Sequence, residues 1–266
     1  MLKLNPIVST KIWGYELWKA STHENGPQKE LWDFVQGDYP LLVKVIQADD
    51  VLSIQVHPDD EKAKELEGCR GKTECWYVLD AKEGASLIYG MNGTYSDAEI
   101  KEAVNSNTLE SFVRSVPVKP GDFVYIPAGT VHAIGPGLRL LEVQQSCDIT
   151  YRLYDWGRGR ECHLDKAVSC IKNLDAQEIS QFKKTFECPY FTLEKFNTEE
   201  IKTETIKCPE ESGPLSVGLI FVLDGEGTIN GEKVQREDIF AFKNGERLQA
   251  EGNLTLMKII PGATEN

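Results

Sequence analysis

Short apolar runs rich in β-branched and aromatic residues recur along the whole chain, and this feature most constrains the fold. Clusters of Gly, Pro, Asp and Asn separate the runs, and such regular spacing is typical of β-sandwiches and β-barrels. We therefore predict an all-β fold. The expected strands cover residues 41–47, 51–57, 75–81, 85–91, 122–128, 138–145, 191–197, 217–225, 227–234, 238–243 and 254–261.

Helical signals are few and short. Residues 58–66 begin with Pro and acidic residues and continue with good helix formers, which predicts a helix there. Ser96 and Glu99 have the spacing of a capping box, so we expect a second helix that continues through Val104. A third short helix is expected over 163–173.

Two stretches of the chain resemble each other weakly. Residues 118–145 and 234–260 both read as a strand, an acidic turn, a strand, a turn containing Gly and a final strand, which suggests a duplicated β-unit. The second copy has no histidine at the position of His132, which falls near Leu248. A polar stretch at 173–188 separates the halves, so we expect a domain 1–173 that carries the site and a degenerate domain 174–266.

The charge balance excludes some partners. The 266 residues carry a formal net charge of −13, which argues against nonspecific nucleic-acid binding. An anionic ligand would have to be held by a local cluster of Lys and Arg. No apolar window has the length of a signal peptide or a membrane span. The seven Cys residues form no CxxC pair, so we expect free thiols and a cytoplasmic location.

Two strands place polar side chains on a shared face. Residues i and i+2 of a strand point to the same side, so Gln55 and His57 project together. Lys72, Glu74 and Trp76 do the same on the next strand. A surface histidine before a proline, or a carboxylate at an exposed rim, would explain either strand alone.

The segment 121–132 has the pattern G(x5)PxGxxH. Its Pro and Gly predict a tight turn that aims His132 into the mouth of a barrel. Two imidazoles, one carboxylate and one amide oxygen suit Zn²⁺ or another borderline divalent metal. The charge of these ligands sums to about −1, which leaves a bound divalent ion able to act as a Lewis acid. Gln55, His57, Glu74 and His132 therefore predict a catalytic metal site.

Five segments together resemble the type I mannose-6-phosphate isomerase family of the cupin superfamily, in its short bacterial form. They are KIWG (11–14), VLSIQVHPD (51–59), GKTECWYVL (71–79), PAGTVHAI (127–134) and TYRLYDWGR (150–158). The resemblance implies two cupin (jelly-roll) β-barrels with a few short helices. It also implies one Zn²⁺ per chain bound by Gln55, His57, Glu74 and His132. The first cupin motif departs from the general pattern HxH followed closely by Glu, and this departure is itself a trait of the family.

The resemblance further implies an activity and its residues. Members interconvert mannose 6-phosphate and fructose 6-phosphate by moving a proton between C1 and C2. The matching positions make Arg152 the catalytic residue and place Lys72, Glu142, Lys44 and Trp13 in the substrate cleft. The separate helical domain of the longer members has no counterpart here, so its contacts cannot be carried over. The oligomeric state stays open.

The reaction needs groups that stabilise an enediolate and a general base. Arg152 stays protonated, so it would hold anionic oxygens of the substrate. Glu142 is one candidate base, because burial in an apolar strand would raise its pKa; a metal-bound hydroxide is the other. Glu142 could instead form a salt bridge with Arg139 or Arg152. We expect Arg158 and Arg160 to lie in a solvated turn.

Two other functions compete with this interpretation. His57, Glu74 and His132 would also fit the facial triad of a metal cupin oxidoreductase, but Gln55 and Arg152 argue against it. A non-catalytic sugar-binding bicupin would predict loss of the metal ligands or of Arg152, and both are present.

Overall fold

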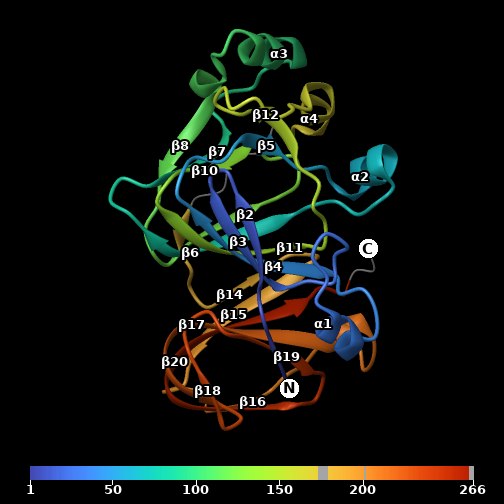
Figure 1. Ribbon diagram of the computed structural model, residues 1–266, viewed down its shortest axis with the longest axis vertical. Coiled ribbons are helices and arrows are strands. Elements are labelled where there is room, and N and C mark those ends of the chain that lie inside the picture. The colour runs from blue at the N-terminus through green and yellow to red at the C-terminus, as the bar shows by residue number, and fades with distance from the viewer. Residues whose placement is uncertain (173–178, 201, 264–266) are drawn as a thin grey trace. The chain divides into compact units, whose positions relative to one another are not determined.

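The computed structural model describes residues 1–172, 179–200 and 202–263 and is built mostly of β-strands with a few short helices (Figure 1). Contacts divide the chain into two compact units. The central unit comprises Val8–Leu17 and Lys44–Gln181. The C-terminal unit comprises Met1–Ile7, Trp18–Val43 and Phe182–Asn266.

These units differ from the expected domains 1–173 and 174–266 in their N-terminal parts. The first residues of the chain belong to the C-terminal unit because β1 (Leu2–Leu4) pairs with β19 (Ile239–Lys243). The division into two sequence domains stays a prediction. Residues 173–178 of the expected boundary lie outside the described part of the chain.

The central unit contains two antiparallel sheets. The order of the five-stranded sheet is β12 (Tyr151–Tyr154), β5 (Ile54–Val56), β10 (His132–Ile134), β7 (Ser86–Met91) and β8 (Val113–Pro117). The order of the seven-stranded sheet is β13 (Ser180–Gln181), β9 (Asp122–Ile126), β6 (Glu74–Ala81), β11 (Leu138–Gln145), β4 (Leu41–Ala48), β3 (Gly14–Ala20) and β2 (Ile7–Lys11). Trp76 and Leu140 from one sheet pack with Leu87 and Ile134 from the other.

Alternation along β5 and β10 decides which side chains face this interior. Ile54, Val56 and Ala133 of the five-stranded sheet pack with apolar residues of α3 (Asp97–Asn105) and α4 (Leu164–Cys170). Figure 1 shows these two helices on the outer side of the sheet. Neighbouring residues of a strand face opposite sides, so Gln55, His132 and Ile134 point inward. Burial of the apolar outer face thus fixes the orientation of the polar side chains on the inner face.

The helices agree with the sequence signals. The capping box of α3 is present, since Ser96 and Glu99 exchange side-chain-to-backbone hydrogen bonds. Asp59 caps α2 (Asp60–Glu67) by accepting from the Lys62 amide. The predicted third helix overlaps α4, and its last residue, 173, lies outside the described residues. α1 (Lys29–Val35) was not predicted, and η1 (Leu109–Phe112) and η2 (Pro214–Ser216) are single 3₁₀ turns.

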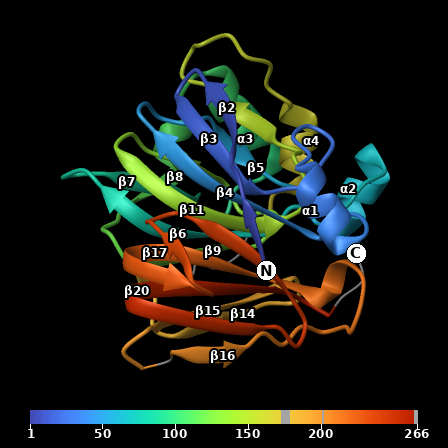
Figure 2. The same ribbon diagram turned by 60° about the horizontal axis from the view of Figure 1, so that its bottom comes forward.

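The C-terminal unit is one extended sheet around its own apolar core, as its strands show in Figure 2. Its main path runs β1, β19, β17 (Val217–Ile229), β20 (Arg247–Pro261), β15 (Phe191–Asn197) and β14 (Thr185–Glu187). β16 (Thr203–Thr205) pairs with β20, and β18 (Glu232–Val234) pairs with β17.

The expected strand break near residue 226 is wrong. β17 continues to Ile229, and the turn follows at Asn230 and Gly231, whose φ angles are positive. β17 stays paired with β20 because Gly225 lets the strands approach closely: an added Cβ there would lie 1.8 Å from the Asn253 oxygen. β20 is continuous where the first repeat has two strands, so the second repeat matches the first only in part.

Gly14 provides a test of close backbone packing. It follows Trp13 with a φ of +142°, and an added Cβ would lie 2.0 Å from the Gln47 carbonyl oxygen. We expect Gly14→Ala to lower the free energy of unfolding by about 2 kcal/mol more than Gly84→Ala does, because it forces a backbone shift. Gly84 is the matched control, since its φ is +77° and no atom lies within 4 Å of the added Cβ. Equal losses in urea unfolding would contradict this account.

Candidate active site

Strand register brings the candidate ligands together. Gln55 lies on β5, between β12 and β10, directly opposite His132 on β10 and opposite Arg152 on β12. Glu74 is the first residue of β6 in the facing sheet, and His57 directly follows β5. Residues from four separate stretches of chain thus meet in the interior of the central unit.

The four side chains form a tight cluster. His57, Glu74 and His132 each offer a ligand atom, and these atoms lie within 4.8 Å of one another. His132 Nε2 is 3.3 Å from Glu74 Oε1, and His57 Nε2 is 3.6 Å from Glu74 Oε2. The Gln55 amide nitrogen is 3.3 Å from His132 Nε2. All three charged or titratable members are about 1% exposed or less.

The hydrogen bonds of the two imidazoles fit a metal site. His57 Nδ1 donates to the Ile149 carbonyl at 2.8 Å, and His132 Nδ1 donates to the Thr130 carbonyl at 2.9 Å. Burial lowers the pKa of His57, and it lowers the pKa of His132 to about 4, so both rings are neutral near pH 7. Each Nε2 is therefore an acceptor that faces Glu74, and such backbone-anchored imidazoles are typical metal ligands.

Glu74 supplies the second sign of a cation site. Neither of its buried oxygens accepts a well-directed hydrogen bond from the described residues. Oε1 faces the unprotonated Nε2 of His132 at 3.3 Å, so two acceptors oppose each other. A cation between them would satisfy both, and the donor set of nitrogen and oxygen atoms suits Zn²⁺. The residues present thus fit a divalent metal.

Two buried lysines lie beside this cluster. Lys72 Nζ is 3.0 Å from Glu74 Oε2 and 3.2 Å from His57 Nε2. Burial alone would lower the pKa of Lys72, but Glu74 and Glu142 raise it above the usual value. Lys44 Nζ is 3.5 Å from Glu142 Oε1, and the pKa of Lys44 is raised by Glu16 and Glu142 against the effect of burial. Both lysines are charged at neutral pH.

Glu142 is a buried carboxyl group whose two oxygens have different partners. Trp76 Nε1 donates to its Oε2 at 2.8 Å, while Oε1 accepts no hydrogen bond from the described residues. Burial raises the pKa of Glu142, and the negative charge of Glu74 raises it further. This agrees with the expected effect of desolvation. Its ion-pair partner is Lys44, so the alternative salt bridge with Arg139 or Arg152 is wrong.

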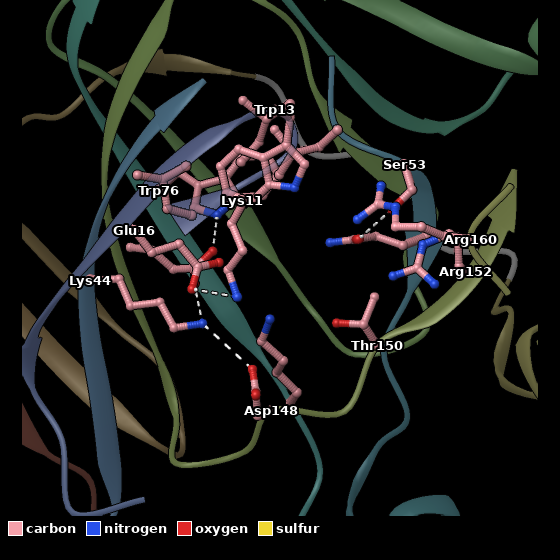
Figure 3. Close-up of a pocket in the computed structure, with 16 residues that line it drawn as sticks. Lys11, Trp13, Glu16, Lys44, Ser53, Trp76, Asp148, Thr150, Arg152 and Arg160 are labelled. Carbon is pink, nitrogen blue, oxygen red and sulfur yellow. Dashed lines mark hydrogen bonds and ion pairs between the residues drawn. The ribbon is translucent and has the colours of Figure 1, made fainter. Parts of the chain in front are cut away.

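Gln55, Lys72, Lys44 and Glu142 line one cavity of about 110 Å³ in the central unit, whereas His57, Glu74 and His132 are not among its lining residues (Figure 3). Five of the lining residues are cationic and three are carboxylates, so the cavity is locally positive in a chain of net charge −13. This is the local cluster that an anionic ligand requires. The lining residues are Lys11, Trp13, Glu16, Lys44, Ile46, Leu52, Ser53, Gln55, Lys72, Trp76, Ile134, Glu142, Asp148, Thr150, Arg152 and Arg160.

Sequence reasoning assigned no role to five of these polar residues: Lys11, Glu16, Ser53, Asp148 and Thr150. For three of them the sequence held a signal, because residues two positions apart on a strand face the same side. Ser53 stands two residues before Gln55, and Thr150 and Asp148 stand two and four residues before Arg152. Lys11 begins the KIWG segment and Glu16 follows it by two residues, and neither position carried an independent sign of a cavity.

The arginines lie in a more ordered environment than expected. Arg158 and Arg160 do not form a solvated turn, since their side chains are 19% and 28% exposed and both pair with Asp155. Arg160 lines the cavity with Arg152 and Ser53, at the opposite end from Lys44 and Glu16 in the view of Figure 3. Arg152 Nη1 donates to the Glu161 carbonyl at 2.6 Å, and its buried Nε has no partner among the described residues.

Among the described residues, no helix has both the length and the apolar character needed to cross a membrane.

Comparison with known proteins identifies the family. Residues 16–85 match the model of the phosphomannose isomerase type I catalytic domain. Mannose-6-phosphate isomerase ManA of Bacillus subtilis is 34% identical over 93% of this chain and 91% of the relative. Mannose-6-phosphate isomerase of Streptococcus mutans is 40% identical over 88% of this chain and 81% of the relative. The crystal structure of the Bacillus subtilis mannose 6-phosphate isomerase superposes with a TM-score of 0.83 at 30% identity, covering 97% of this chain and 98% of that one. The chain therefore belongs to the type I mannose-6-phosphate isomerase family.

Proposed function

We propose that this protein is a mannose-6-phosphate isomerase. It would interconvert mannose 6-phosphate and fructose 6-phosphate by proton transfer between C1 and C2. The observation that carries the proposal is a buried metal-ligand cluster next to a locally positive cavity, which Gln55 of the cluster and the buried Glu142 both line. Proton transfer next to a carbonyl needs both kinds of group.

The metal would be held by His57, Glu74, His132 and Gln55, one Zn²⁺ or another divalent ion per chain. The cluster of His57, Glu74 and His132 supports this, because its opposed acceptor atoms need a cation. Ser53 Oγ now donates to Gln55 Oε1 at 3.2 Å. Exchanging the two ends of the amide would present Oε1 to the cluster and let Nε2 donate to Ser53. When bound, the metal supplies Lewis-acid stabilisation of the negative charge that develops on the substrate oxygen.

Glu142 is the proposed general base. Its Oε2 is held by Trp76, which leaves Oε1 to remove a proton from one carbon and return it to the neighbouring carbon. A raised pKa suits this role, because a base whose pKa is nearer to neutrality exchanges protons in both directions. Lys44, 3.5 Å from Oε1, keeps the ionised form accessible in spite of burial.

The cationic groups of the cavity would bind the anionic parts of the sugar phosphate. The charged Lys72 lies next to the proposed metal ligands and can reach oxygens near C1 and C2. Arg152 and Arg160 lie at the other end of the cavity with unused N–H groups, so we assign them to the phosphate and to anionic oxygens of the substrate. Trp13, which is 5% exposed, forms an apolar wall.

We also propose that the fold consists of two cupin barrels. The facing sheets of the central unit would form the metal-binding barrel. The sheet of the C-terminal unit encloses a core of apolar side chains without the metal-ligand set, which supports a degenerate second barrel. A cytoplasmic location and a small-molecule partner, with neither nucleic acid nor membrane, complete the proposal.

A coupled assay tests the function. The purified protein, loaded with Zn²⁺, is incubated with mannose 6-phosphate, and fructose 6-phosphate formation is followed by conversion to glucose 6-phosphate and its oxidation. We expect turnover that a chelator abolishes and that added Zn²⁺ restores. Sugar-phosphate binding without turnover would favour a non-catalytic bicupin. Oxygen consumption in the same sample would favour a metal cupin oxidoreductase.

Arg152→Ala is expected to lower kcat/KM by about 10²-fold or more, because a guanidinium that faces developing negative charge is lost. Arg152→Lys should recover only part of this, since a lysine cannot reproduce the fork of donors. Steady-state kinetics with mannose 6-phosphate measure both variants. A kcat/KM of Arg152→Ala close to that of the wild type would remove this residue from the catalytic site.

A further inference from the structure

The chain between β12 and α4 forms a loop, residues 155–163, that carries Arg160 to the cavity. Trp156, Gly157 and Gly159 all have positive φ angles, so the loop turns sharply. A bulky residue rarely adopts such a φ unless its surroundings hold it there. Here Trp156 Nε1 donates to the Leu52 carbonyl at 2.7 Å.

Asp155 is the centre of this loop. Its side chain is 3% exposed and accepts hydrogen bonds from two guanidinium groups. Arg158 Nη2 donates to Oδ1 at 2.9 Å, and Arg160 donates to both oxygens, with Nε to Oδ2 at 2.9 Å. A two-point pairing of this kind fixes the plane of a guanidinium as well as its position.

The loop is also attached to the strand that carries the proposed ligands. Arg158 Nη1 donates to the Val51 carbonyl at 2.7 Å, and Trp156 binds the neighbouring Leu52 as described. Val51 and Leu52 lead directly into Ser53 and Gln55, which line the cavity. The clamp on Asp155 therefore links Arg160 to the wall of the site.

The pairing leaves part of Arg160 available. Nε and Nη2 are turned to Asp155, whereas Nη1 has no partner among the described residues. Arg160 and Arg152 line the same cavity and repel each other, and the Asp155 carboxylate offsets this repulsion. Without it, a guanidinium with 28% of its side chain exposed would be free to turn toward solvent.

We propose that Asp155 is a positioning residue for substrate binding, which holds the Arg160 guanidinium with its free edge toward the cavity. This inference rests on the proposed function, in which the cationic end of the cavity binds the phosphate of the sugar. Asp155 itself touches no substrate, and it acts through Arg160.

Asp155→Asn tests the proposal, because an amide offers one acceptor oxygen and turns a donor toward the second nitrogen of Arg160. We expect the KM for mannose 6-phosphate to rise about tenfold while kcat stays within about twofold. The phosphate contacts stabilise the bound substrate and the transition state equally, so their loss weakens binding without slowing the chemical step. Inorganic phosphate should bind about tenfold more weakly in calorimetry, a readout that needs no turnover. Asp50→Asn is the matched control. Asp50 is 61% exposed and lies 3.6 Å from Arg158, so its change should alter neither the KM nor the phosphate affinity.

A double-mutant cycle separates positioning from a structural role. In the Arg160→Met background, Asp155→Asn should cause no further rise in KM, because the residue through which it acts is gone. Equal effects in both backgrounds, or an unchanged KM and phosphate affinity in Asp155→Asn, would overturn the proposal. If Asp155→Asn does not fold, Asp155→Glu keeps the charge and should give a smaller rise in KM with an unchanged kcat.

A wild type that binds phosphate but shows no isomerase activity would refute the proposed function and leave the phosphate measurements as the test of Asp155.

Discussion

Glu74→Gln is expected to lower kcat by about 10³-fold or more and to weaken Zn²⁺ binding strongly. The change keeps the shape of the side chain but removes the only formal negative charge among the four proposed ligands. A loss of 10³-fold corresponds to about 4 kcal/mol of transition-state stabilisation. The measurements are kcat in the coupled assay and zinc content of the purified protein by elemental analysis.

Thermal unfolding distinguishes a ligand from a structural carboxylate at this position. A metal that binds only the native state raises its stability by mass action, so Zn²⁺ should raise the Tm of the wild type and leave that of Glu74→Gln unchanged. Glu65→Gln is the control, because Glu65 is an exposed residue of α2 that pairs with Lys62 on the same helix; it should respond to zinc like the wild type. A Glu74→Gln protein that keeps a full complement of zinc and normal turnover would refute the proposed metal site.

Glu142→Gln is expected to lower kcat by about 10²–10⁴-fold, which is the usual contribution of a general base. The amide can still accept the hydrogen bond of Trp76, so KM should change little. The Tm should fall, because the buried Lys44 loses the charge of its ion-pair partner. Steady-state kinetics and thermal unfolding measure these values. A kcat within a few-fold of the wild type would exclude Glu142 as the base.

The pH dependence of kcat gives a second readout for Glu142. A base acts in its ionised form, so the activity should fall as the pH falls through the pKa of Glu142. Burial raises that pKa, and the acid limb of the wild type should therefore lie above the usual glutamate value of about 4.5. Glu142→Gln should lose this limb while it keeps its residual activity.

The long strands could be predicted from the sequence because their side chains alternate. β4, β6, β11 and β15 all coincide closely with expected strands. No strand was expected before residue 41, so β1, β2 and the seven-residue β3 were missed. The strands β8, β10 and β12 were also missed, since three to five residues show too little periodicity. Their pairing with β5 and β7 determines them, and such long-range pairing is not visible in a local pattern.

The same distinction applies to the site. Gln55, His57, Glu74 and His132 could be selected because residue type, spacing and turn chemistry agreed. The partners of Glu142 could not, because Lys44 and Trp76 meet it only through the order of β4, β11 and β6 in the sheet. Arg160 was misjudged for a similar reason: a Gly-rich segment reads as solvated until its pairing with a buried aspartate is known.

The pairing of β1 with β19 has a consequence for synthesis on the ribosome. Leu2 and Ala241 are partners in this ladder, so β1 cannot pair until translation has reached β19. The central unit that carries the metal ligands lies almost entirely in one stretch of chain, residues 44–181. Its strands can therefore pair while translation continues. We therefore expect nascent chains in which residue 181 has left the exit tunnel to contain a protease-resistant catalytic half together with an unpaired β1.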